Sequence, residues 1–371
     1  MYANLKSTND NKVLTISIAA YNVEKTLGET LDSLVKDVPE GTLQKLEILV
    51  VNDGSKDSTK EVAAKYEEKY PECVALISKD NAGWGSTVNT SISFAKGKYL
   101  KLLDGDDWFQ TENLPEFIDF LEKAEADIVL SPYVKRFPDR EELQDAHTEI
   151  SEQISGLESL DPDIDIYMHE LAVRTERLRE GGVSITEHCF YTDNEYAFEA
   201  IKCSDTVQRF GKPVYIYRLG DSEQSVGLSG ILKHYKDTVA VAEKMYESYC
   251  GKENRSGDRN ENLKQDRSKD LKKVLEEDLS GNRKVNRKPI SEIKDQILQR
   301  KLLLITDSLY VSYLLVNSPE AKKELIRFDR ELKKRPEIYR LTGENKKIKS
   351  LRMTGFLLYG YLAGKVRARF N

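Results

Sequence analysis

Cysteine and long apolar runs are both scarce in this sequence of 371 residues. The four cysteines form no Cys-x-x-Cys pair, which argues against a disulfide framework and for reduced thiols in a cytosol. No stretch approaches the ~20 apolar residues that a membrane-spanning helix needs. Residues 1–12 are polar and carry no apolar signal region, so we expect a cytoplasmic protein. The cysteines are Cys73, Cys189, Cys203 and Cys250.

Negative charge is missing from the last part of the chain. Residues 345–371 contain seven basic residues and no acidic one, whereas the whole chain has a net charge of −6. The rest of the chain is therefore acidic, and without a groove-reading motif this argues against a nucleic-acid partner. The tail also contains the aromatic-rich run 356–363. Two interpretations stay open: contact with an anionic membrane surface, or a terminal helix docked on the protein with its basic face in solvent.

Strand-like and helix-like segments alternate through the first 131 residues. Short β-branched runs are separated by segments whose apolar residues recur at helical spacing. This pattern predicts an α/β fold with a mostly parallel, Rossmann-like sheet and helices on both faces. The expected strands are Val13–Ala20, Leu46–Val51, Val74–Ser78, Tyr99–Leu103 and Asp127–Leu130, and the expected helices are Thr26–Val35, Asp57–Tyr70, Ser86–Ala95 and Leu114–Leu121.

The alternation weakens from Pro132 to Asp165, where we expect a mixed loop and helix excursion. Helical periodicity returns near the C-terminus after a charged linker at 251–287. We therefore divide the chain into an α/β domain, 1–228, and a helical C-terminal region, 229–371. The remaining expected strands are Ile166–Arg174, Gly182–Ile185 and Val207–Arg218, and the remaining expected helices include Asn194–Ile201, Ile231–Cys250 and Ile293–Val316.

Four polar loops would open on one edge of this sheet. Ligands of open α/β sheets bind beyond the carboxyl ends of the strands, and the segments after the first four strands are all small, polar or acidic. Four such loops in succession indicate a binding site. They are Ala19–Asn22, Asn52–Ser55, Lys79–Gly83 and Asp104–Asp107.

The last of these loops, Asp104-Gly105-Asp106-Asp107, gathers three carboxylates within four residues. Unpaired carboxylates repel one another and are costly to bury. Such a cluster is stable mainly around a cation, and oxygen ligands suit Mg²⁺ or Mn²⁺. A metal-diphosphate site is the hypothesis, and a plain turn is the alternative, because Asp and Gly are common turn residues.

Taken together, the motifs resemble the family 2 inverting glycosyltransferases with the GT-A fold, over roughly residues 13–235. The later motifs resemble a bacterial branch that builds cell-surface polysaccharides. The resemblance implies a UDP-sugar donor, a glycan acceptor that can be lipid-linked, and a divalent ion, Mn²⁺ or Mg²⁺. The matching segments are Ser17–Asn22, Val51–Ser58, Asn81–Gly83, Gly97–Tyr99 and Asp104–Asp107, and later Phe190–Tyr196, Tyr215–Gly220 and Gln224–Val226.

The resemblance also implies site residues. Asp104 and Asp106 would bind the metal, with Asp104 also facing the ribose. Tyr21 would lie against the uracil, and Asp53 would accept from the uracil N3–H, with a turn cap as the alternative for Asp53. The implied nucleotide-sugar residues are Ala19, Tyr21, Asp53, Asn81, Gly83, Asp104 and Gly105.

Several residues of these loops are expected to shape the site. Asn22 and Asn81 would order their loops more than they touch a ligand. Gly83 and Gly85 would let the backbone approach the diphosphate closely. Asp107 would cap the segment that follows it.

An inverting transfer also needs a base that takes the proton of the acceptor hydroxyl. The resemblance assigns this role to Asp193, at the start of an expected helix whose N-terminus would favour the ionised carboxylate. The alternative for Asp193 is a helix N-cap. Glu195 is a local rival for the role of base, and Glu187 is a weaker candidate.

The chain departs from the family pattern at Val88, where many relatives carry an arginine that could meet the diphosphate. Lys79 is the residue that we expect to supply the missing positive charge. Gln224, Ser225 and His234 are candidates for contacts near the phosphate or the acceptor. For His234, a place on a surface helix is the alternative.

The leading functional hypothesis is transfer of a hexose or N-acetylhexosamine from a UDP-sugar to a growing glycan, with the acceptor side built from about residue 132. A nucleotidyltransferase is one alternative, but residues 19–25 lack the Gly-rich, Arg-containing loop expected for it. A non-catalytic scaffold is another, against which the intact Asp104, Asp106 and Asp193 argue. The protein would act in the cytoplasm or on the inner face of the membrane through its basic tail.

Overall fold

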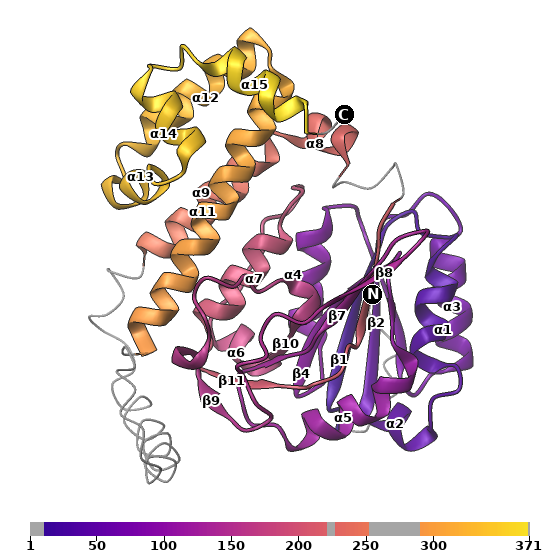
Figure 1. Cartoon of the computed structure of the whole chain (residues 1–371). Coiled ribbons are helices and arrows are strands. Elements are labelled where there is room, and N and C mark those ends of the chain that lie inside the picture. The colour runs from indigo at the N-terminus through magenta and orange to yellow at the C-terminus, as the bar shows by residue number, and fades with distance from the viewer. Residues whose placement is uncertain (1–10, 221–226, 252–289, 370–371) are drawn as a thin grey trace, which may run out of the picture.

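The structure of this chain, a computed structural model, describes residues 11–220, 227–251 and 290–369. The strands of its main sheet are β1 (Leu14–Ala20), β2 (Leu46–Asp53), β3 (Val74–Lys79), β4 (Tyr99–Asp104), β6 (Ile128–Leu130), β9 (Ser155–Gly156), β10 (Leu171–Arg174) and β11 (Thr206–Arg209). Their order is β3-β2-β1-β4-β10-β6-β11-β9 (Figure 1). The first four are parallel to one another, whereas β9 and β10 run antiparallel to their neighbours. The expected α/β fold with a mostly parallel, Rossmann-like sheet is confirmed.

The four parallel strands are apolar because helices cover the sheet on both faces. All eight residues of β2, for example, are buried. Helices α1 (Leu27–Val35) and α3 (Thr59–Lys69) lie on one face, and α4 (Trp84–Phe94) lies on the other (Figure 1). The register pairs Ala19 with Asp104 and Asp53 with Lys79. The four strands therefore end at one edge, and their loops share it.

A second sheet of four strands lies beside this edge. Its strands are β5 (Trp108–Phe109), β7 (Tyr133–Arg136), β8 (Glu141–Gln144) and β12 (Tyr215–Arg218), in the order β5-β12-β7-β8. Because β5 directly follows the acidic loop after β4, its pairing with β12 brings residues that are more than 100 positions apart in the sequence together. The other helices of the α/β part are α2 (Glu40–Lys45), α5 (Leu114–Lys123), α6 (Thr175–Glu180) and α7 (Asp193–Lys202).

Four expectations for the middle of the chain are wrong or incomplete. The excursion at 132–165 forms strands and a 3₁₀ turn instead of an α-helix. Within 166–174 only the last four residues form a strand, and 182–185 is a loop. The single strand expected at 207–218 is two strands in different sheets, because a Gly-Lys-Pro segment ending at Pro213 interrupts the pairing.

Helices make up the described parts of the C-terminal region, as expected. They are α8 (Leu228–His234), α9 (Asp237–Cys250), α11 (Ile290–Val316), α12 (Pro319–Leu332), α13 (Pro336–Thr342), α14 (Lys346–Met353) and α15 (Tyr359–Arg367). The helix expected at 231–250 is therefore two helices, and the linker expected at 251–287 lies, apart from Gly251, outside the described residues. Among the helices of the described ranges, none is long and apolar enough to cross a membrane.

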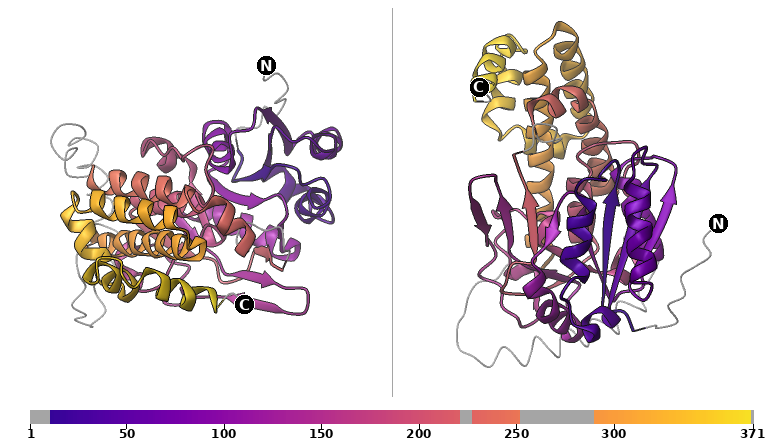
Figure 2. Two further views of the ribbon diagram at one scale, coloured as in Figure 1. Left: turned by 90° about the horizontal axis from the view of Figure 1, so that it is seen from above. Right: turned by 90° about the vertical axis from the view of Figure 1, so that its right-hand side faces the viewer.

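The C-terminal helices stand above the carboxyl edge of the sheet. The long helix α11 packs against α7 and α9 and carries α12 to α15 at its far end (Figures 1 and 2). Helix α2, which immediately precedes β2, lies at the bottom of Figure 1, so the strands run upward toward the helical region. The predicted site and the basic tail therefore lie toward the same end of the molecule.

Candidate functional site

Hydrogen bonds tie the polar loops of the carboxyl edge together. The Asn22 backbone N–H donates to Ser55 Oγ at 3.0 Å, and the Lys56 N–H donates to Asn22 Oδ1 at 2.9 Å. The Asn81 side-chain amide donates to the backbone carbonyl of Asp53 at 2.9 Å. Both asparagines thus order their loops, as the sequence predicted.

The Asp53 carboxylate anchors the loop after β3 and is only 2% exposed. Its Oδ1 accepts from Lys79 Nζ at 2.6 Å and from the Ala82 N–H at 3.0 Å, and its Oδ2 accepts from the Gly83 N–H at 2.7 Å. These bonds use three of the about four acceptor sites of a carboxylate. The ion pair also uses the charge that we expected Lys79 to offer a diphosphate. Asp53 therefore caps the turn with its carboxylate, as the alternative interpretation predicted.

The two glycines next to this loop have different tasks. Gly83 has φ +86°, a backbone conformation that glycine adopts readily. A Cβ on Gly85 would lie 2.1 Å from the Thr186 carbonyl oxygen. The small size of Gly85 therefore serves the close contact between α4 and the loop before α7, and a close approach of its backbone to a diphosphate stays a prediction.

Asp104 lies at the end of β4 and accepts a hydrogen bond from Trp84 Nε1 at 2.7 Å. Burial, followed by the charges of Asp106 and Asp193, raises the pKa of Asp104 to about 7. The predicted metal pair and the predicted base therefore lie within electrostatic reach of one another. Next to them, a Cβ on Gly105 would lie 2.9 Å from the Ala19 carbonyl oxygen, so Gly105 lets the loops after β1 and β4 approach closely.

The fourth residue of the acidic loop, Asp107, joins the loop to β12. It is 1% exposed and accepts from the Tyr215 hydroxyl and, at 2.8 Å, from the Arg218 backbone N–H. The Arg218 Nε donates in addition to the Asp106 carbonyl oxygen at 2.7 Å. The expectation that Asp107 caps the next segment is therefore wrong, since its carboxylate holds two segments of distant sequence together.

Asp193 is the first residue of α7, and Thr192 occupies the N-cap position before it. The capping alternative for Asp193 is therefore not realised. Burial raises the pKa of Asp193, and the Asn194 backbone N–H and the Lys301 ammonium oppose this rise. Lys301 belongs to α11, so the C-terminal region contributes a charge that favours the ionised form of Asp193.

The two rival carboxylates hold the loop before α7. Glu195 is fully buried, and its oxygens accept from the Thr186 N–H at 3.1 and 3.2 Å. Burial raises its pKa to about 7. Glu187 accepts from the Asn89 side-chain amide at 3.2 Å, and the same amide also bonds the backbone of Ile185. These contacts give both glutamates a structural role.

Two residues of the site were not found from the sequence. The sequence does contain a feature that could have identified Trp84 as a site residue, because this indole N–H donor directly follows the polar loop that ends at Gly83. Lys301 had a weaker signal, as a lysine that directly precedes the apolar run 302–305 of a helix. It is 2% exposed, and its ammonium donates to the Ile166 carbonyl oxygen.

The carboxylates fit a divalent ion that substrate helps to hold. Within the described ranges, no group of three or more His, Cys, Asp and Glu side chains forms a ready-made metal site. Asp104 and Asp106 instead offer two carboxylates whose mutual repulsion raises a pKa. Mg²⁺ is usually bound by one or two carboxylates together with substrate phosphates. The donor set therefore suits such an ion.

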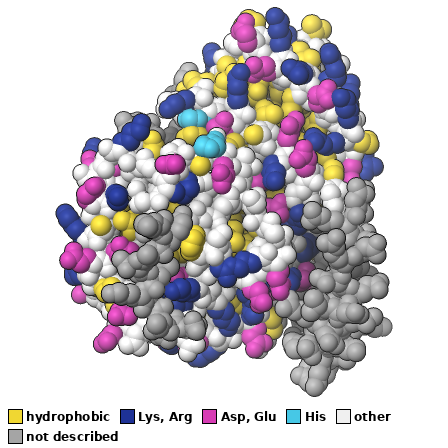
Figure 3. Space-filling model, turned by 180° about the vertical axis from the view of Figure 1, so that it is seen from behind, with side chains coloured by type: hydrophobic (Ala, Val, Ile, Leu, Met, Phe, Trp, Pro, Cys, Tyr) yellow, Lys and Arg dark blue, Asp and Glu magenta, His cyan; other side chains and the backbone are white. Residues whose placement is uncertain are grey.

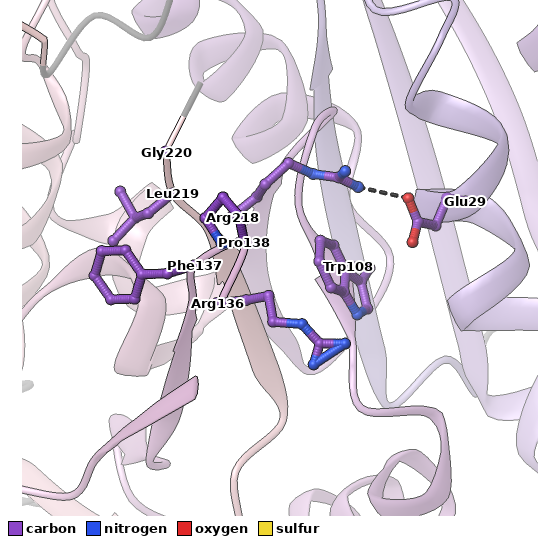
Figure 4. Close-up of a pocket in the computed structure, with 8 residues that line it drawn as sticks. All are labelled: Glu29, Trp108, Arg136, Phe137, Pro138, Arg218, Leu219 and Gly220. Carbon is purple, nitrogen blue, oxygen red and sulfur yellow. Dashed lines mark hydrogen bonds and ion pairs between the residues drawn. The ribbon is translucent and has the colours of Figure 1, made fainter. Parts of the chain in front are cut away.

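An open pocket of about 600 Å³ lies beside the acidic loop. The Arg218 guanidinium lies 4.5 Å from the centre of the Trp108 ring and forms an ion pair with Glu29 at 2.5 Å (Figure 4). Arg136 lines the pocket on the other side of Trp108 (Figure 4). The pocket's lining contains none of the predicted site residues, so it is a neighbouring feature.

Three further candidates from the sequence have different outcomes. His234 stacks on Phe190 with 3.6 Å between the ring centres, so it packs against the segment before α7. Gln224 and Ser225 lie outside the described residues.

Comparison with known proteins finds similarity to glycosyltransferases. Residues 15–180 match the family model described as glycosyl transferase family 2. The chain is 26% identical over 214 residues to the uncharacterized glycosyltransferase EpsJ of Bacillus subtilis, covering 56% of this chain and 61% of EpsJ. It is 34% identical over 119 residues to a poly(ribitol-phosphate) beta-glucosyltransferase of Bacillus spizizenii, covering 32% of this chain and 18% of that protein. The chain thus spans less than two thirds of the length of these curated relatives.

Solved structures show the same fold. Residues 1–349 of S. aureus TarS in complex with UDP-GlcNAc superpose with a TM-score of 0.55 and 17% identity. The superposition covers 96% of this chain and 88% of the TarS chain.

Proposed function

We propose that this chain, whose residues 15–180 match the glycosyl transferase family 2 model, transfers a hexose or N-acetylhexosamine from a UDP-sugar to a bacterial cell-surface glycan, with inversion. The meeting of Asp104, Asp106 and Asp193 at the carboxyl edge of the sheet carries this proposal. The names of the curated relatives support the acceptor class, and the UDP-GlcNAc in the TarS structure supports the donor class.

In this proposal Asp193 is the base. Its carboxylate takes the proton of an acceptor hydroxyl while the hydroxyl oxygen attacks the anomeric carbon from the face opposite UDP. The bond between the anomeric carbon and the UDP oxygen breaks, and UDP leaves with the electron pair. Lys301 and the N-terminal end of α7 favour the ionised Asp193 that this step needs.

Asp104 and Asp106 would hold Mn²⁺ or Mg²⁺. A bound divalent ion offsets the negative charge that builds on the departing UDP. Trp84 orients the Asp104 carboxylate, and Arg218 fixes the backbone of the loop at Asp106. The Tyr21 ring, 46% exposed, is available as a surface for the uracil beside the loop that Asp53 anchors.

The first prediction concerns the donor and the ion. UDP is expected to bind with Mn²⁺ present and to bind about tenfold or more weakly after chelation with EDTA, because the ion carries part of the diphosphate contact. Isothermal titration measures both affinities, with GDP as the nucleobase control. Equal UDP affinities with and without the ion would reject the assignment of Asp104 and Asp106 as metal ligands. Hydrolysis of a GDP-sugar but of no UDP-sugar would reject the assignment of a UDP-sugar as the donor.

We also propose that residues 1–228 form the catalytic part and residues 229–371 a helical part that directs it toward an acceptor at a membrane. An ion pair at 3.0 Å between Arg300 of α11 and Asp165 joins the two parts. The basic tail packs on the protein, because Arg367 donates to the Leu315 carbonyl and Lys347 pairs with Asp307.

The turn between α14 and α15, together with the end of α14 and the first turn of α15, nevertheless presents large apolar side chains to solvent. Met353 is 78% exposed, Leu357 83% and Tyr361 59%. In the upper part of the molecule in Figure 3, apolar side chains lie among both basic and acidic ones. Apolar groups flanked by basic ones suit an anionic membrane surface, so we propose that this turn touches the membrane.

The second prediction tests this contact. The combined Met353→Ser, Leu357→Ser and Tyr361→Ser variant is expected to bind phosphatidylglycerol-containing vesicles about tenfold or more weakly, because three apolar anchors are lost. Co-sedimentation with vesicles measures the binding. Truncation at residue 345 is a poorer test, since it removes the buried Ile348 and Leu351 and uncovers the core.

Leu143→Ser is the matched control for that variant, because Leu143 is 59% exposed on β8 in the other part of the protein. It should bind vesicles as the unchanged protein does. Failure of the unchanged protein to bind, or equal binding by the triple variant, would reject the membrane contact.

A further inference from the structure

The hydroxyl of Tyr217 forms no hydrogen bond with any other described residue. Its ring is half-buried, and burial followed by the charges of Asp107, Asp104, Asp193 and Asp106 raises its pKa. The hydroxyl therefore stays protonated at neutral pH and is available as a donor beside four carboxylates.

The position of Tyr217 follows from strand geometry. Tyr215, two residues earlier on β12, accepts from the Asp104 backbone N–H at 3.3 Å, so it lies level with the end of β4. Residues i and i+2 of a strand share a face and lie about 6.6 Å apart. Tyr217 consequently lies one such step from Tyr215 along β12, and Arg218, the next residue, is bonded to the acidic loop. The charge of Asp193 contributes to the raised pKa of Tyr217, so Tyr217 lies within electrostatic reach of Asp193.

An aromatic stack holds the Tyr217 ring in place. The His169 ring lies 4.4 Å from it at an interplanar angle of 28°. His169 is itself stacked on Tyr133 at 5.0 Å and meets the edge of Tyr215 at 4.8 Å. Burial and the nearby Lys101 lower the pKa of His169 to about 3, so the stack is uncharged. A fixed, neutral ring with one polar tip is well suited to a sugar, which has apolar C–H faces and hydroxyl edges.

We propose that Tyr217 contacts the transferred sugar of the donor, with its hydroxyl donating to a sugar hydroxyl and its ring lying along a C–H face of the pyranose. The inference rests on the proposed function. The nucleotide is assigned to the loops that contain Tyr21 and Asp53, whereas Tyr217 lies beside the acidic loop and within electrostatic reach of Asp193. A sugar that is passed from UDP to an acceptor must lie between the nucleotide and the base.

The test compares UDP with UDP-sugars. Tyr217→Phe keeps the ring on His169 and removes only the hydroxyl. With Mn²⁺ present, we expect UDP affinity to stay within about twofold. Affinity for the preferred sugar nucleotide among UDP-glucose, UDP-galactose and UDP-GlcNAc should fall about five- to tenfold, the cost of one lost hydrogen bond. Tyr217→Ala, which also removes the ring, should lose more. Isothermal titration gives all of these values.

Tyr70→Phe is the matched control, because Tyr70 directly follows α3 at the opposite edge of the sheet and the substitution removes the same hydroxyl oxygen. It should leave both affinities unchanged. An equal loss for UDP and UDP-sugar in Tyr217→Phe would place Tyr217 at the nucleotide, and no loss for either would remove it from the site. Both results overturn the inference and leave the glycosyltransferase proposal intact. Failure of the unchanged protein to bind any sugar nucleotide would remove the two together.

Discussion

Asp193→Asn is expected to lower kcat for sugar transfer by about 10²–10⁴-fold, the usual contribution of a general base. Asparagine cannot take the acceptor proton, although it preserves the size and the position of the side chain at the start of α7. UDP affinity should stay nearly unchanged, because Asp193 is assigned to the acceptor and not to the nucleotide. Steady-state transfer assays and titration with UDP measure the two quantities.

Glu195→Gln is the control, because it makes the same carboxyl-to-amide change two residues away. Glu195 is buried against the Thr186 N–H, so its replacement should lower the melting temperature more than it lowers kcat. Burial raises the pKa of Asp193 above its ordinary value of 3.8, so activity should fall with decreasing pH earlier than an exposed aspartate would predict. Retained turnover in Asp193→Asn would assign the base to another residue.

Asp104→Asn is expected to abolish ion-dependent binding of UDP and to stabilise the ligand-free protein at pH 8. The pKa of Asp104 is about 7 in the folded protein against an ordinary value of 3.8. The stability that its protonated form contributes is fully present below about pH 4 and is lost as the pH rises through 7. Asparagine keeps an acceptor for Trp84 but carries no charge. The gain at pH 8 should be about 1–2 kcal/mol after solvent screening.

Thermal unfolding without ligand at pH 5 and pH 8 measures this effect, and the advantage of the variant should grow between the two values. Asp205→Asn is the control of opposite sign. Partial desolvation raises the pKa of Asp205, but the charges of Lys294 and Arg177 outweigh this effect and lower it, so removal of the carboxylate should destabilise the protein at pH 8. An Asp104→Asn variant that is less stable than the unchanged protein at pH 8 would show that burial and the neighbouring carboxylates do not destabilise the ionised Asp104.

The first 131 residues show how much of the fold local patterns predict. Each expected strand there agrees with an observed one within two residues, because β-branched runs between polar loops are a strong signal. Prediction was poorer after Pro132, where strands are short and pair across long separations. The Gly-Lys-Pro break before Val214 divides one apolar run between two sheets, and periodicity alone does not distinguish this from a single strand.

The candidate site divides in the same way. The sequence by itself determined that four polar loops share one edge, because parallel strands joined by helices necessarily end together. Only the tertiary structure decided the partner of each carboxylate. Asp53 is held by Lys79, and Asp107 is held by Tyr215 and Arg218. Lys301 of α11 acts on Asp193. Contacts of this kind depend on how distant segments approach one another, and no spacing along the chain encodes that approach.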